Sequence, residues 1–108
     1  MTLEEIVKSA ADIEVVEDRG GDAQYVELVF NTKDTGRWDA VLSRFLGPAV
    51  KKPGNKPSDP HSALTRPFGG VYKDQTLYHH KSATDEIIAM FWPWQNGQQV
   101  TLKLAKLT

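Results

Sequence analysis

The segment from Glu86 to Pro93 constrains the fold more than any other, because it is apolar on both faces of a strand. Successive side chains of a β-strand point to opposite faces of the sheet. Each face of this segment carries three apolar side chains, namely Ile88, Met90 and Trp92 on one and Ile87, Ala89 and Phe91 on the other. A strand with one solvated face would alternate apolar and polar residues. We therefore expect two helices to cover one face, and a loop, sheet curvature or another subunit to cover the second.

Two segments have the periodicity of amphipathic helices. The first begins with Thr2 to Glu5, a capping box in which a hydroxyl and a carboxylate bind free backbone N–H groups of the first turn. The second begins at Asp34 or Thr35 and ends at Gly47-Pro48. Its large apolar residues recur at helical spacing, and they are Trp38, Val41, Leu42, Phe45 and Leu46. Each helix therefore has one face that can pack on a sheet.

Strand-forming segments fill most of the remaining chain. Residues 13–17 and 23–31 predict a hairpin whose reversal lies at Asp18 to Asp22, where paired glycines permit positive φ. The last third of the chain predicts a meander with strands at residues 68–73, 76–81, 86–93 and 98–106. The predicted fold is therefore an α+β domain in two layers, in the order α-β-β-α-β-β-β-β, with a mostly antiparallel sheet and two helices on one face.

The register of the last hairpin depends on Pro93, which has no backbone N–H. A two-residue turn at Asn96-Gly97 would place Pro93 at a hydrogen-bonded position of the ladder. A three-residue loop at 95–97 avoids this conflict. The expected pairs are then Ile88 and Met90 with Leu104 and Leu102, and Trp92 with Val100.

A proline-rich loop at residues 47–67 separates the second helix from the meander and contains five of the six prolines. Loops of this length are usually functional or disordered. Its cations and the following Gly69-Gly70 have the composition of an anion-binding lip, and these cations are Lys51, Lys52, Lys56 and Arg66. We expect this segment to be a solvated tether, and the anion-binding lip is the alternative. With 108 residues, the whole chain, 1–108, fits a single domain.

Charge and composition limit the partners that we expect. The net charge of −1 gives no bulk cationic field for nucleic acid. Residues 1–35 carry nine acidic and three basic side chains, which leaves +5 for the rest, and we expect the two parts to interleave on the surface. There is no cysteine and no secretory pattern at the start, which favours a cytoplasmic location. The longest apolar run, residues 87–94, is far shorter than a membrane-spanning helix of about 20 residues.

Five residues are the candidate contacts for a ligand or partner: Arg66, Tyr78, His79, His80 and Trp94. His79 and His80 are neighbours on a strand, so their imidazoles point to opposite faces and are not expected to share a metal ion. We expect no metal and no cofactor. One of the two histidines is expected to be exposed and the other half-buried. Trp94 lies beside the last turn, where burial and intermolecular contact remain equally open.

Three functions follow from these features. The expected one is a non-catalytic binding or assembly domain, either a homodimer or one with a protein partner, because of the doubly apolar strand. The first alternative is a small enzyme or small-molecule receptor with Arg66 and one histidine in a pocket under the 47–67 loop. The second is single-stranded nucleic-acid binding, with Tyr72 and Tyr78 as stacking rings beside lysines. No catalytic residue is assigned, since Ser62 and His61 are only sequence neighbours.

Overall fold

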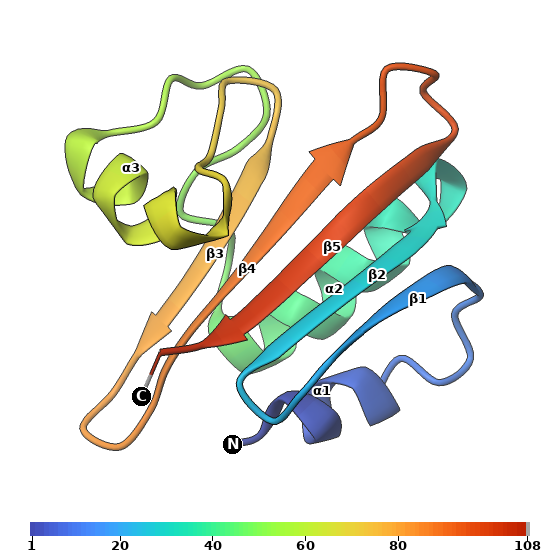
Figure 1. The fold of residues 1–108 in the computed structure, drawn as a ribbon, viewed down its shortest axis with the longest axis horizontal. Coiled ribbons are helices and arrows are strands. Elements are labelled where there is room, and N and C mark those ends of the chain that lie inside the picture. The colour runs from blue at the N-terminus through green and yellow to red at the C-terminus, as the bar shows by residue number, and fades with distance from the viewer. Residues whose placement is uncertain (108) are drawn as a thin grey trace.

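The computed structural model describes residues 1–107, which form one five-stranded antiparallel sheet in the order β1-β2-β5-β4-β3. In chain order the elements are α1 (Leu3–Lys8), β1 (Val15–Gly21), β2 (Tyr25–Asn31), the 3-10 turn η1 (Thr32–Asp34), α2 (Thr35–Leu46), α3 (Asp59–Thr65), the 3-10 turn η2 (Arg66–Phe68), β3 (Thr76–Lys81), β4 (Glu86–Pro93) and β5 (Gln99–Lys106). Figure 1 shows α2 behind the sheet and α1 near the β1–β2 hairpin. The predicted α+β class and the antiparallel sheet are confirmed.

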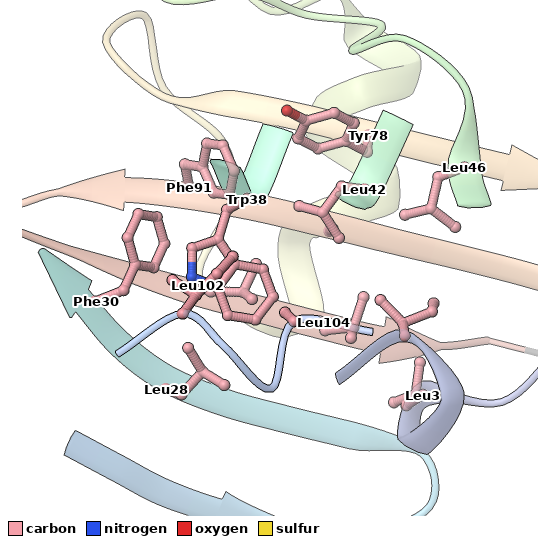
Figure 2. Packing of buried hydrophobic residues seen from close by; sticks show 14 of the residues in the cluster. Leu3, Leu28, Phe30, Trp38, Leu42, Leu46, Tyr78, Phe91, Leu102 and Leu104 are labelled. Carbon is pink, nitrogen blue, oxygen red and sulfur yellow. The ribbon is translucent and has the colours of Figure 1, made fainter. Parts of the chain in front are cut away.

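Helices α1 and α2 pack on the same face of the sheet, as predicted. The Thr2 hydroxyl accepts a hydrogen bond from the Glu5 backbone N–H at 3.1 Å and so caps α1. The second half of the predicted capping box differs, because the Glu5 carboxylate accepts from the Thr2 hydroxyl rather than from a backbone N–H. The core on this face joins the two helices to apolar side chains from β2, β3, β4 and β5 (Figure 2). Trp38 is fully buried, whereas Phe45 from the same apolar stripe is only half-buried. Among the described residues, no helix has the length and apolar composition needed to traverse a lipid bilayer.

The end of the proline-rich segment and the residues after it cover the second face of the sheet, and the segment contains a helix that was not predicted. Ser58 caps α3 by accepting from the His61 backbone N–H, and Pro60 lies in the first turn, where its missing N–H costs nothing. The buried cluster on this face consists of Val71, Leu77, Ile88, Met90 and Ala105. Partly buried side chains of the segment, of the residues that follow it and of the sheet pack against this cluster, and they are Tyr25, Leu64, Phe68, Trp92 and Leu107. The segment therefore folds back onto the sheet and is not the solvated tether expected from its composition.

The predicted strand at residues 68–73 is wrong. Gly69 and Gly70 have φ of 98° and 83°, a left-handed conformation that breaks an extended strand. This region instead forms η2 and a turn, and Val71 then packs against the sheet. The expectation for β4 is confirmed, since Ile87 to Phe91 are all buried. Both of its faces are covered within the chain.

The reversal of the first hairpin lies at residues 22–24, later than the predicted reversal at 18–22. Gly20 and Gly21 belong to β1, where the register shifts relative to β2. The turn is made by Asp22, whose Oδ1 accepts from the backbone N–H groups of Gln24 and Tyr25 at 2.8 and 3.1 Å. The glycines therefore shape a bulged edge strand rather than the turn itself.

The predicted register between β4 and β5 is wrong by one residue. Leu102 pairs with Phe91 and Leu104 pairs with Ala89, so these leucines face the helices. The Trp94 N–H donates to the Gln99 carbonyl at 2.9 Å, which leaves four residues in the loop. Hydrogen-bonded and non-hydrogen-bonded pairs alternate along the ladder, so the neighbouring pair of Pro93 with Val100 needs no N–H. Pro93 is accommodated by a longer loop.

Candidate functional site

A groove of about 410 Å³ lies between α2, the start of the proline-rich loop and the sheet. Its lining comes from three sources: Thr35, Asp39 and Ser43 from α2, Pro48, Lys52 and Pro53 from the loop, and Thr76, Tyr78 and Phe91 from β3 and β4. The helical residues are spaced four apart, which places them on one side of α2. The groove combines the carboxylate of Asp39, the ammonium group of Lys52 and several hydroxyl groups with apolar walls.

Tyr78 connects the floor of the groove to the core. Its ring points to the helix face, is 1% exposed and packs edge-on against Phe91 with 5.5 Å between ring centroids (Figure 2). Its hydroxyl donates a hydrogen bond to Asp39 Oδ1. Burial, and then the hydrogen bond and the charge of Asp39, raise the pKa of Tyr78 above its usual range. The phenol therefore keeps its proton and acts as a fixed donor.

Asp39 presents a carboxylate to the groove with one oxygen engaged. Oδ1 accepts from the Tyr78 hydroxyl and from the Ser43 hydroxyl, the latter at 3.3 Å. Oδ2 has no hydrogen-bond partner, and Asp39 no ion-pair partner, among residues 1–107. Two donors on one oxygen restrict rotation of the carboxylate about its bond to Cβ. One oriented oxygen therefore remains for a donor from outside the chain.

Lys52 and Thr76 supply the other polar groups of the groove. Lys52 is exposed and forms no ion pair within the described part of the chain. Thr76 is buried, and its hydroxyl is likewise without a hydrogen-bond partner in residues 1–107. The Asp39 carboxylate on α2 and the Lys52 ammonium group on the loop therefore line different walls of the groove.

Lys51 holds the loop wall in position. It is 2% exposed, and its Nζ donates to the carbonyl oxygens of Tyr72, Lys73 and Gln75, each at 2.6 Å. Its backbone also pairs with Leu77 of β3 through hydrogen bonds in both directions. Burial lowers the pKa of Lys51, and the charge of Asp74 opposes this shift. The neighbouring Lys52 and Pro53 are thereby attached to the sheet.

Arg66 lies in a different place from the one predicted. It is exposed and lines a separate hollow of about 280 Å³ with Ser62 and Tyr72. The alternative of an anion-binding lip is not supported, because the Gly69 N–H donates to the Arg66 carbonyl and the Gly70 N–H donates to the Thr65 carbonyl. These N–H groups are already used within the chain.

His79 and His80 do not converge with Arg66. They pair with Ile88 and Ile87 of β4, so they point to opposite faces as predicted, but both are half-buried rather than one being exposed. His79 Nε2 lies 2.8 Å from Glu86 Oε2. Neither imidazole lines the Arg66 hollow or the Asp39 groove. The pocket predicted from Arg66 and a histidine is not formed.

The aromatic candidates are used within the fold. Trp94 is half-buried, its Nε1 donates to the Thr101 hydroxyl at 2.8 Å, and the Arg19 guanidinium lies 5.7 Å from its ring centroid. Tyr72 is 58% exposed, but Tyr78 is buried and cannot stack on a base. The two tyrosines therefore do not form the predicted platform for nucleic acid.

Tyr78 was among the predicted contact residues, whereas Asp39 and Lys52 were not predicted as groove residues. The one available signal was the spacing of Asp39 and Ser43, four apart and beside the apolar stripe of α2. Within residues 1–107, no group of three or more histidine, aspartate or glutamate side chains could hold a metal ion. No protein-family model, curated protein or solved structure matches this chain.

Proposed function

We propose that this protein is a non-catalytic binding module that holds a small ligand in the groove between α2 and residues 48–53. The observation that carries this proposal is the Asp39 carboxylate, which Tyr78 and Ser43 hold through Oδ1 while Oδ2 is left for a ligand. Preorganised polar groups beside apolar walls are typical of ligand sites. The volume of about 410 Å³ falls in the range of such sites.

The lining specifies the chemistry of the ligand. Asp39 Oδ2 would accept from an ammonium group, and Lys52 would attract a carboxylate. Pro48, Pro53 and Phe91 would contact an apolar part of the ligand. The ligand class that fits all three is a zwitterionic amino carboxylate with an apolar side chain.

Binding fits the site better than catalysis does. The raised pKa of Tyr78 makes its phenol a poor proton donor to a substrate at neutral pH. Ser43 donates to a carboxylate rather than to an imidazole, and neither His79 nor His80 lines the groove. The site therefore has a fixed recognition group without an activated nucleophile.

The test is a titration of the ¹⁵N-labelled protein with free leucine, followed by amide chemical shifts. We expect saturable shifts at Thr35, Asp39 and Lys52, and weaker binding of isoamylamine and of isocaproate, which each lack one charged group. Two charged contacts at an exposed site predict a loss of roughly fivefold for each analogue. The shifts should localise to the groove.

The matched variants are Asp39→Asn and Asp59→Asn. Asparagine keeps Oδ1 as an acceptor for Tyr78 and Ser43 and removes only the charge, so the fold should be retained. Asp59→Asn removes the same charge from α3, away from the groove. We expect only Asp39→Asn to weaken leucine binding. Equal binding by both variants, or shifts outside the groove, would show that the proposal is wrong.

A further inference from the structure

The helical layer leaves one edge of the sheet uncovered. All seven residues of β1 are exposed, and Val15 and Val16 are 41% and 48% exposed. A groove of about 580 Å³ opens there between α1 and the β1–β2 hairpin. Figure 1 shows that α2 crosses behind the other strands while β1 lies at the margin of the sheet. The face beside α1 thus has room for a further element.

The floor of this groove is apolar. Val7 from α1 and Val26 from β2 are half-buried and pack at the margin of the main core, and Leu28 lies beneath them. Half-buried aliphatic side chains in a groove gain free energy when a partner covers them, at about 25 cal/mol per Å² of apolar surface. The floor therefore favours an apolar face of an incoming segment.

The hairpin wall of the groove is acidic and unneutralised. Asp18 and Asp22 line it, and neither has an ion-pair partner among residues 1–107. The two lysines that also line the groove are already paired, Lys8 with Glu4 at 3.0 Å and Lys106 with Asp85 at 3.3 Å. The local field is therefore negative.

The fold concentrates this charge at one edge. Residues 1–35, with nine acidic and three basic side chains, include β1 and β2 at one side of the sheet order, whereas β3 is at the other. The two parts still interleave elsewhere, since Arg37 of α2 pairs with Asp12 and Asp34. A long-range negative field at this edge would attract a cationic partner and speed its association.

We infer that this groove docks a basic amphipathic helix of a protein partner. The apolar face of that helix would lie on Val7, Val26 and Leu28, and its lysine or arginine side chains would reach Asp18 and Asp22. In this position the helix would lie beside α1 and extend the helical layer toward β1. The inference is independent of the Asp39 groove, because the two grooves share no lining residue.

The test uses a fluorescent helical peptide of leucine and lysine, a leucine and glutamate peptide of the same pattern, and a scrambled leucine and lysine peptide. We expect the patterned basic peptide to bind best by fluorescence anisotropy, with affinity that falls as salt rises. The scrambled peptide has the same charge without an apolar face. Equal binding of the scrambled peptide would overturn the inference.

Two double variants separate the groove from general charge. Asp18→Asn with Asp22→Asn keeps the side-chain oxygens that cap the hairpin, and should weaken binding roughly five- to tenfold. Asp59→Asn with Asp74→Asn removes the same charge from the proline-rich side and should leave binding unchanged. Val26→Thr, which removes apolar surface at constant shape, should also weaken binding. Equal losses in both double variants, or self-association of the protein through Asp18 and Asp22, would contradict a basic helical partner.

Discussion

Lys51 shows how one buried polar side chain can organise a loop that has few regular hydrogen bonds of its own. Its ammonium group is surrounded by three carbonyl oxygens from the turn at residues 72–75. Charged donors form stronger hydrogen bonds than neutral ones, and a buried ammonium needs such partners. The aliphatic part of the Lys51 side chain crosses from the loop to the turn. Lys51 therefore connects the proline-rich segment to the start of β3.

We predict that Lys51→Met lowers the free energy of unfolding by about 2 to 4 kcal/mol, because three carbonyl groups lose a charged donor. Methionine retains most of the volume, so the loss reports the hydrogen bonds more than a cavity. The measurement is urea unfolding followed by circular dichroism. Lys52→Met is the matched control, since Lys52 is exposed, and its effect should stay within about 0.5 kcal/mol. Similar effects of both substitutions would contradict this account of Lys51.

Among the elements, the β1–β2 hairpin depends on a close backbone contact at Gly21. A Cβ atom built at Gly21 would lie 2.0 Å from the Tyr25 carbonyl oxygen, whereas one at Gly20 would have no atom within 4 Å. Both glycines have positive φ, at 140° and 82°. The two positions therefore separate a steric clash with the backbone from the cost of positive φ alone.

We predict that Gly20→Ala costs about 1 kcal/mol of folding stability, from left-handed backbone strain. Gly21→Ala should cost at least about 3 kcal/mol or shift the hairpin register, because the Tyr25 carbonyl cannot move without breaking the turn. Thermal unfolding gives the stabilities, and amide exchange of Leu28 and Val29 reports the register. Equal losses for the two alanine variants would show that the clash is relieved locally.

Of the whole molecule, the most important property is that the chain covers both faces of its own sheet. The doubly apolar β4 suggested a second subunit, but α3, η2 and Val71 cover that face within one chain. The surface that motivated a homodimer is therefore occupied by the chain itself.

We predict that replacing residues 59–71 by a Gly-Ser linker of equal length exposes Leu77, Ile88 and Met90. The variant should bind a hydrophobic dye and associate with rising concentration, whereas the unmodified protein should sediment as a monomer at micromolar concentration. A linker at residues 55–57, which are exposed or half-buried, is the control and should change neither property. A monomeric variant that binds no dye would mean that the sheet does not need this cover.

Local patterns in the chain were enough to predict several elements. Three features depend on residues that lie within a few positions of one another. They are the apolar stripe of α2, the N-terminal cap of α1 and the two buried faces of β4. Such periodicities report which side chains must be buried, because helix and strand geometry repeat over short distances. They do not report which distant segment provides the cover.

The features of the candidate site depend on contacts between segments far apart in the chain. Tyr78 and Asp39 are 39 positions apart, and Lys51 reaches carbonyl groups more than 20 positions away. The register of β4 with β5 followed from the hydrogen-bond alternation beside Pro93. Helix α3 is only seven residues long, and a helix of this length is not stable without packing. These features are decided only by the tertiary structure, because each requires two surfaces to meet in a particular geometry. Local residue preferences contain no information on that geometry.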